Sequence, residues 1–199
     1  MSVSIHRVCV FTGSRPGQRP EYAEAARALG AALAARKIGL VYGGASVGLM
    51  GVLADGVLDA GGDVVGVIPS WLTDRELGHT RLADLRVVGS MHERKAAMAE
   101  LADAFIAMPG GFGTFDELFE IVTWAQIGLH NKPIGLLDVG GFFDPVNRLL
   151  EHVVAEGFAP KEHLGLVITR PSVDALLDAL LAFTPPPLGA KWTDIRGRG

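Results

Sequence analysis

The clearest candidate for chemistry in this sequence is a glycine-rich turn at residues 109–117, which reads Pro-Gly-Gly-Phe-Gly-Thr-Phe-Asp-Glu. An apolar run precedes this turn and a long apolar, helix-like stretch follows it, so a strand should end in a turn that opens a helix. Such a turn directs backbone N–H groups and a helix N-terminus at one small volume, which suits an anion such as phosphate. Glu117 would hold a carboxylate beside that anion.

A purely structural interpretation of the same residues is also open. Thr114 followed three residues later by Glu117 fits a capping box, which contributes about 1 kcal/mol and needs no function. A capping box does not require Pro-Gly-Gly before it, so the glycines favour the anion site. Glu117 could serve in both roles.

A basic pair, Arg94 and Lys95, follows a second capping-box pattern formed by Ser90 and Glu93. Isolated basic pairs usually lie on solvated helix faces. The rest of this helical segment carries few charges, however, and it directly precedes the strand that leads to the Pro-Gly-Gly turn. The N-terminus of this helix can therefore approach the same crevice.

Two further glycine turns occur, at residues 12–17 and 43–51. Ser14 offers a hydroxyl in the first turn, and Gly44 lets the backbone approach a ligand closely in the second. Neither turn matches the dinucleotide pattern G-x-G-x-x-G or the phosphate loop of NTPases, so we predict no dinucleotide cofactor. In an open parallel sheet, turns at the carboxyl ends of the strands should converge on one crevice.

The elements that must position these turns alternate between strand-like and helix-like patterns. Strands are expected at residues 7–11, 38–42, 63–68, 85–88, 104–108, 133–137 and 166–169. Helices are expected at residues 20–36, from the second glycine turn to 59, and at 90–103, 114–126, 145–156 and 173–183, with an irregular segment at 69–84. This alternation predicts an α/β fold with a doubly wound parallel sheet. We expect a single domain over residues 1–184 and a flexible tail over 185–199.

Composition excludes several classes of function. A formal net charge of −4 argues against a general nucleic-acid or membrane binder. The sequence shows no signal peptide and no apolar run of about 18 residues, so we expect a cytoplasmic protein without a membrane span. The histidines are scattered and Cys9 is the single cysteine, so we predict no metal site and no disulfide. A pyridoxal phosphate enzyme would need a Schiff-base lysine, and only Lys95 is well placed.

The helix-like stretch after Glu117 is apolar on nearly all sides, so it should be buried on most of them. It could be a central helix of the monomer or a subunit interface. Phe119 and Trp124 favour a two-fold homodimer.

Several motifs occur together over about residues 7–183. They are Met-His-Glu-Arg-Lys-Ala at 91–96, the Pro-Gly-Gly turn with Glu117, Thr-Trp-Ala-Gln at 123–126, and Val-Tyr-Gly-Gly at 41–44 followed by Ser-Val-Gly-Leu-Met-Gly at 46–51. In these motifs the sequence resembles the LONELY GUY (LOG) family of cytokinin-activating phosphoribohydrolases, many of which carry the older label "lysine decarboxylase-like".

The resemblance implies a Rossmann-like fold, usually dimeric, and hydrolysis of the N-glycosidic bond of N6-substituted adenosine 5′-monophosphates to free base and ribose 5-phosphate. AMP itself is often a substrate in the family, and no cofactor or metal is needed. By this resemblance, Arg94 and Glu117 match the catalytic pair. The predicted substrate- and phosphate-binding residues are Ser14, Gly44, Glu76, Lys95, Gly110, Gly111, Phe112, Gly113, Thr114 and Thr123.

Some positions depart from the family pattern. Ala45 stands where many members have a third glycine, Phe112 where tyrosine is common, and Phe115-Asp116 where Leu-Glu is common. None of these changes removes a proposed catalytic group.

The mechanism that we expect passes through an oxocarbenium-like ribosyl transition state, which Glu117 stabilises while it orients or activates water. Arg94 should orient Glu117 or the ribose, and the two should form an ion pair when the site is empty. That pairing should lower the pKa of Glu117. A non-catalytic nucleotide carrier or sensor on the same fold is the alternative function, and a purely structural oligomerising module is a third.

Overall fold

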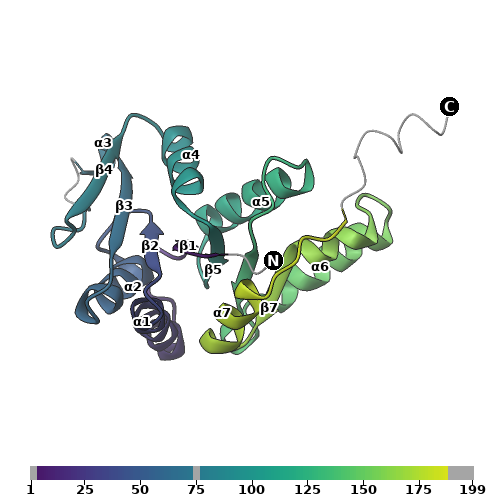
Figure 1. Cartoon of the computed structure of the whole chain (residues 1–199), viewed down its shortest axis with the longest axis horizontal. Coiled ribbons are helices and arrows are strands. Elements are labelled where there is room, and N and C mark those ends of the chain that lie inside the picture. The colour runs from purple at the N-terminus through teal and green to yellow at the C-terminus, as the bar shows by residue number, and fades with distance from the viewer. Residues whose placement is uncertain (1–3, 74–76, 188–199) are drawn as a thin grey trace.

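Seven parallel strands form one sheet in the computed structural model, which describes residues 4–73 and 77–187 (Figure 1). The strands lie in the order β4-β3-β2-β1-β5-β6-β7. Their bounds are β1 Arg7–Phe11, β2 Gly39–Tyr42, β3 Val64–Pro69, β4 Asp84–Val88, β5 Ala104–Ala107, β6 Ile134–Leu137 and β7 Val167–Arg170. Every pairing between neighbours is parallel, as the alternation of strands and helices in the sequence predicts.

Helices cover both faces of this sheet. Their bounds are α1 Pro20–Ala35, α2 Gly48–Asp59, α3 Ser70–Thr73, α4 Met91–Leu101, α5 Phe112–Gln126, α6 Asp144–Ala155 and α7 Val173–Leu181, with the 3-10 segments η1 Val139–Gly141 and η2 Lys161–Leu166. One apolar core lies beneath α1, α2 and α7, and a second lies beneath α4, α5 and α6. The doubly wound α/β prediction is confirmed.

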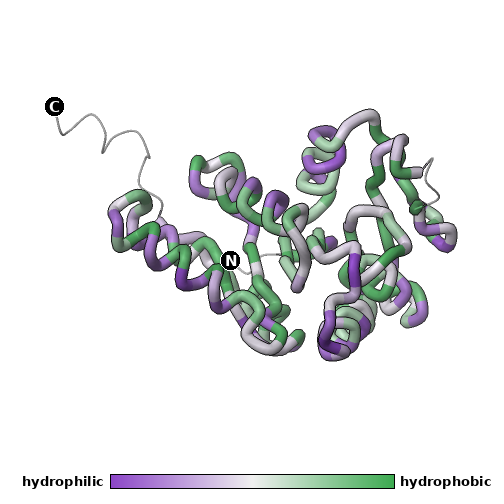
Figure 2. The backbone as a smooth tube through the Cα atoms, turned by 180° about the vertical axis from the view of Figure 1, so that it is seen from behind, coloured by the Kyte–Doolittle hydropathy of each residue, from purple (hydrophilic) through white to green (hydrophobic). Residues whose placement is uncertain are grey.

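The strands are short and almost fully buried in the centre of the sheet, because both of their faces are covered. Cys9 is buried within this centre as a core residue. Figure 2 shows hydrophilic and hydrophobic residues alternating along the outer helices, as amphipathic helices require.

The direction in which successive strands are added to the sheet reverses at β1. Strands β1 to β4 are added toward one edge of the sheet, and the chain then returns through α4 to place β5 on the other side of β1. Phe11 is in register with Ala107, so β1 and β5 end at the same level. Ligands of open α/β sheets bind at such a switch point, and two of the glycine turns meet there.

The structure differs from the predicted elements in a few places. Part of the segment predicted to be irregular, residues 69–84, forms the four-residue helix α3. Helix α5 begins at Phe112 rather than at Thr114. Residues 188–199 of the predicted tail lie outside the described residues, and so does Glu76. Within the described ranges, no helix is both long and apolar enough to cross a bilayer.

Candidate active site

Three glycine turns meet at the carboxyl ends of the strands, as predicted. The backbone N–H of Gly13 donates to the carbonyl of Pro109 over 3.2 Å, and the Thr12 hydroxyl donates to the same carbonyl over 3.0 Å. The N–H of Leu49 donates to the carbonyl of Gly13 over 3.0 Å. The turn after β1 is therefore hydrogen-bonded to both of the others.

Close backbone approach explains why two of these positions are glycine. Gly48 has a φ of +59°, and a Cβ atom there would overlap the backbone of Ser14. A Cβ atom at Gly110 would overlap the Thr114 hydroxyl and lie 2.9 Å from the backbone nitrogen of Gly13. Any side chain at either position would push the turns apart.

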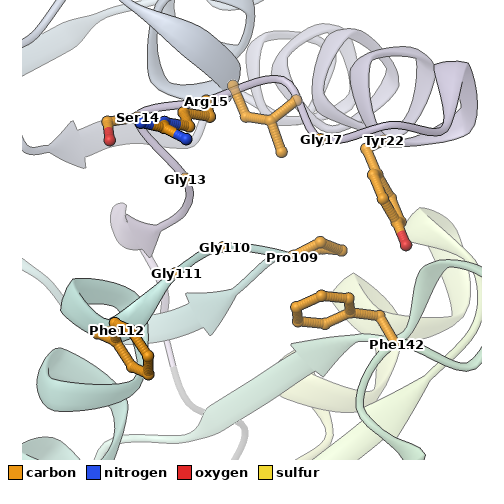
Figure 3. Close-up of a pocket in the computed structure, with 11 residues that line it drawn as sticks. Gly13, Ser14, Arg15, Gly17, Tyr22, Pro109, Gly110, Gly111, Phe112 and Phe142 are labelled. Carbon is orange, nitrogen blue, oxygen red and sulfur yellow. The ribbon is translucent and has the colours of Figure 1, made fainter.

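A cavity of about 540 Å³ lies where the first and third turns meet (Figure 3). Four residues that the sequence predicts as binding residues line it: Ser14, Gly110, Gly111 and Phe112. Helix α5 begins at the cavity with Gly111 as its N-cap, so the first N–H groups of the helix have no carbonyl partner within it. These groups and the helix dipole suit an anion at this place.

The capping-box interpretation of Thr114 and Glu117 is wrong. The N-cap of α5 is Gly111, whose position has no side-chain hydrogen bond, and Thr114 is the third residue of the helix. Thr114 and Glu117 are both buried instead, one turn apart on the inner face of α5. Half of the second predicted box forms at α4, where the hydroxyl of the N-cap residue Ser90 accepts from the N–H of Glu93. The Glu93 carboxylate accepts from the N–H of Gly89, one residue before the N-cap.

Arg94 and Glu117 form a buried ion pair, as expected. Nη1 of Arg94 on α4 donates to Oε1 of Glu117 on α5 over 2.8 Å, and the two side chains are 10% and 9% exposed. Nε of Arg94 donates to the carbonyl of Val67 near the end of β3 over 3.1 Å. The capped start of α4 and the glycine turn before α5 therefore place the two charges against one another.

The expected direction of the Glu117 pKa is wrong. Burial raises the pKa of the Glu117 carboxyl above its ordinary value, and this effect outweighs the neighbouring Arg94 guanidinium, which acts in the opposite direction. A buried carboxyl with a raised pKa is a stronger base when it is ionised, as the chemistry of water activation requires.

The ion pair of Arg94 and Glu117 is not part of the cavity wall, which is formed largely by the turns after β1 and β5. Glu117 lies about 7 Å further along α5 than its first residue, Phe112. A ligand with its anion at the start of α5 could therefore reach the carboxylate with a part of its body.

Lys95 is paired with acids on α5. Its ammonium lies 3.1 Å from Asp116 and 3.1 Å from Glu120. Burial by itself lowers the pKa of Lys95, but the hydrogen bonds to these two carboxylates outweigh it and raise that pKa. Lys95 therefore borders the ion pair on α4 without lining the cavity.

Thr123 is not brought to the cavity of its own chain. It lies about 16 Å along α5 from Phe112, is exposed, and donates its hydroxyl to the carbonyl of Phe119 over 2.7 Å. Thr123 lines a separate hollow together with Asp116, Phe119 and Trp124, among others. In the single chain α5 is not buried on most sides, because Phe119 and Trp124 are only half-buried.

The remaining predicted residues are distributed as follows. Gly44 belongs to the turn after β2, where its carbonyl accepts from the N–H of His79 over 2.9 Å. Gly113 is the second residue of α5, beside the cavity but not part of its wall. Glu76 lies outside the described residues.

Sequence reasoning missed several residues of the cavity wall, notably Arg15, Tyr22 and Phe142. Arg15 forms no ion pair or hydrogen bond of its side chain with any described residue. Its position directly after Ser14 was the available signal. Tyr22 lies on α1 and Phe142 in the segment after β6, and their rings meet edge to face with their centroids 5.9 Å apart. No local sequence pattern predicts this contact.

Metal ligation finds no support in the described ranges 4–73 and 77–187. No group of three or more His, Cys, Asp or Glu side chains is close enough together there to hold a metal ion.

Comparison with known proteins identifies relatives whose sequences align with most of this chain. A family model described as possible lysine decarboxylase matches residues 50–180. The probable cytokinin riboside 5′-monophosphate phosphoribohydrolase LOGL9 of Oryza sativa subsp. japonica is 48% identical over 90% of this chain and 79% of its own length. The cytokinin riboside 5′-monophosphate phosphoribohydrolase LOG of the same organism is 46% identical, over 94% and 78%.

Similar solved structures extend the comparison at the level of the fold. A molybdenum cofactor binding protein from Rippkaea orientalis superimposes with a TM-score of 0.68 at 21% identity, over 91% of this chain and 98% of its own. The molybdenum cofactor carrier protein from Chlamydomonas reinhardtii gives a TM-score of 0.66 at 23% identity, over 89% and 98%. At such low identity these proteins share the fold alone.

Proposed function

The chain belongs to the LOG family of cytokinin riboside 5′-monophosphate phosphoribohydrolases, and from this premise we propose that it hydrolyses the N-glycosidic bond of N6-substituted adenosine 5′-monophosphates and of AMP. The products are the free base and ribose 5-phosphate. The relatives named above are enzymes, and this chain is an enzyme of their family.

The observation that carries the proposal is the buried pair of Arg94 and Glu117, which lies little more than one helical turn from the glycine turn at the N-terminus of α5. A nucleotide whose 5′-phosphate lies at the N-terminus of α5 can extend its ribose along the helix toward Glu117. The carboxylate is then beside the anomeric carbon, where positive charge develops as the glycosidic bond breaks.

The residues of the site divide the tasks of this mechanism. Glu117 stabilises the cationic sugar and accepts a proton from the water that attacks C1′. The electrons of the C1′–N bond leave with the base, which takes up a proton from solvent. Arg94 holds the carboxylate in place through its bond to Oε1. The phosphate, bound by residues 110–114 and by Ser14, anchors the ribose and contributes binding energy remote from the reacting atoms.

We assign the contacts to the base to Lys95, Gly44 and Thr123, which lie away from the cavity, on the strength of the family motifs. The same motifs assign Glu76 to this group. Because Thr123 is far from the cavity of its own chain, we assign its contact to a ligand bound in a second copy of the chain.

A homodimer is therefore part of the proposal. The half-buried Phe119 and Trp124 support an interface along α5, as do Ile127 and Leu129 beyond its end, which are 43% and 67% exposed. Sedimentation equilibrium at micromolar concentration should give twice the mass of the chain. A cytoplasmic location remains a prediction, which fractionation of cells that express the protein would test.

The decisive experiment is a panel of nucleoside 5′-monophosphates incubated with the purified protein, with free base and ribose 5-phosphate measured by chromatography. We expect base release from AMP and from N6-isopentenyl AMP, and none from adenosine, which lacks the anchoring phosphate. A nucleotide carrier would bind AMP in equilibrium dialysis and return it intact. Binding without release from any member of the panel would therefore replace the enzyme with the carrier.

A further inference from the structure

Gly43, which follows the last residue of β2, lies directly against the guanidinium of Arg94. A Cβ atom at position 43 would overlap Nη2 of Arg94, lie 3.1 Å from its Cζ and lie 3.2 Å from Sδ of Met50. The volume that a side chain at this position would need is therefore already filled by the head of Arg94.

The guanidinium is held in that volume from two other directions. Its Nε donates to the carbonyl of Val67 over 3.1 Å, and its Nη1 donates to Glu117 over 2.8 Å. Arg94 is 8% exposed as a whole residue. The head group cannot move aside without breaking one of these buried hydrogen bonds.

Space, and not backbone conformation, is what position 43 requires. Gly44, the next residue, has a φ of +74°, which favours glycine, whereas Gly43 is not among the residues with positive φ. Alanine at position 43 would therefore fit the backbone and conflict only with what lies where its methyl group must go.

We propose that Gly43 is a positioning residue for the reaction. Because it has no side chain, it leaves the space in which the guanidinium of Arg94 is held against Glu117. The inference rests on the proposed function, in which this pair does the chemistry. A methyl group at position 43 would displace the head of Arg94 at the cost of one of these hydrogen bonds, and a displaced head would no longer orient the carboxylate. Misplacement by about 1 Å can cost about 100-fold in rate.

The test compares Gly43→Ala with a matched control, Gly78→Ala. Gly78 forms a β-bridge with Ala45, which belongs to the same turn as Gly43, and it also lacks a positive φ. A methyl group added at Gly78 would make only ordinary contacts, at 3.4 and 3.6 Å. We expect Gly43→Ala to lower kcat for AMP about 100-fold with a small change in KM, and Gly78→Ala to change kcat less than about threefold. The acid limb of the kcat–pH profile should move to higher pH in Gly43→Ala alone, because Glu117 loses the cation that opposes its raised pKa.

A double-mutant cycle with Arg94→Ala distinguishes a loss of stability caused by displacement of Arg94 from a general destabilisation of the fold. If Gly43 acts through Arg94, then Gly43→Ala should lower the midpoint of thermal unfolding in the wild type and have no further effect in Arg94→Ala, where the methyl has room. Equal losses in both backgrounds would overturn the proposal, as would wild-type kcat in Gly43→Ala. The cycle needs no substrate. A protein that releases no base would refute the proposed function, but the coupling between the two substitutions in thermal unfolding would still show whether Gly43 makes room for Arg94.

Discussion

Replacement of Glu117 by glutamine is the sharpest test of the proposed chemistry, because it removes one charge and almost nothing else. The amide has the shape of the carboxylate, and its oxygen can still accept from Nη1 of Arg94 at the observed 2.8 Å. The capping of α5 does not change either, since its N-cap is Gly111 and involves no side chain. Glu117→Gln therefore tests the charge and basicity of the group.

The structure indicates two opposing effects on stability. A hydrogen bond from a guanidinium to a neutral oxygen is weaker than one to a carboxylate by about 1 kcal/mol. The substitution also removes the free-energy cost of burying the carboxylate charge. Burial of this charge is what raises the pKa of Glu117. We therefore expect the free energy of unfolding at pH 7 to change by no more than about 1 kcal/mol. Loss of a general base costs about 100-fold or more in kcat, or about 2.7 kcal/mol in the barrier.

The stability difference should depend on pH with a definite sign. The raised pKa of Glu117 means that the folded state holds its proton more tightly than the unfolded state does. This contribution to wild-type stability is fully present below about pH 4 and is lost as the pH rises through the folded-state pKa. Glutamine does not titrate, so the stability of Glu117→Gln relative to the wild type should increase over the same range.

The assay is base release from AMP at saturating substrate, beside urea unfolding at several pH values between 4 and 8. A folded Glu117→Gln variant that releases ribose 5-phosphate at the wild-type rate would refute the catalytic role of the carboxylate. A variant that fails to fold would support a structural role for the pair instead. The pH trend of the unfolding data would identify the cause.

Three further experiments test the remaining parts of the site. Arg15→Gln removes a cation of the cavity wall that has no partner among the described residues, so KM for AMP should rise ten- to hundredfold with little change in kcat, and steady-state kinetics would measure it. Gly110→Ala places a methyl against Thr114 and Gly13 and should lower the free energy of unfolding by about 2 kcal/mol in urea titrations. Gly113→Ala, whose methyl meets nothing within 4 Å and which lies within α5, should not lower it. The double variant Arg94→Met/Glu117→Leu should unfold at the same or a higher urea concentration than the wild type and have no detectable base release.

The layout of the fold could be predicted from the sequence because its signals are local. Short apolar runs alternate with helix-like stretches, and glycine turns separate them, so the doubly wound sheet and the meeting of the turns follow from general rules. The start of α5 was misplaced by the same local reasoning. Thr114 and Glu117 have the spacing of a capping box, but their burial against the core makes them inner-face residues of a helix that begins two residues earlier.

The parts that could not be predicted depend on contacts between distant segments. The direction of the Glu117 pKa depends on how much water the fold excludes, and a sequence does not show this. The fit of Arg94 against Gly43 joins α4 to the end of β2, and the wall formed by Tyr22 and Phe142 joins α1 to the segment after β6. Each of these contacts follows from the order of the strands in the sheet.

The charges around the site indicate how a protein of net charge −4 can attract a nucleotide anion. Two of the nearby cations are already neutralised, Arg94 by Glu117 and Lys95 by Asp116 and Glu120. The long-range field therefore gives no steering, and attraction must come from groups within a few ångströms, namely the unpaired N–H groups at the start of α5 and the guanidinium of Arg15. Backbone N–H groups carry no net charge and are screened little by salt at such short range. Binding of AMP should accordingly depend only weakly on ionic strength, and most of that dependence should disappear in Arg15→Gln.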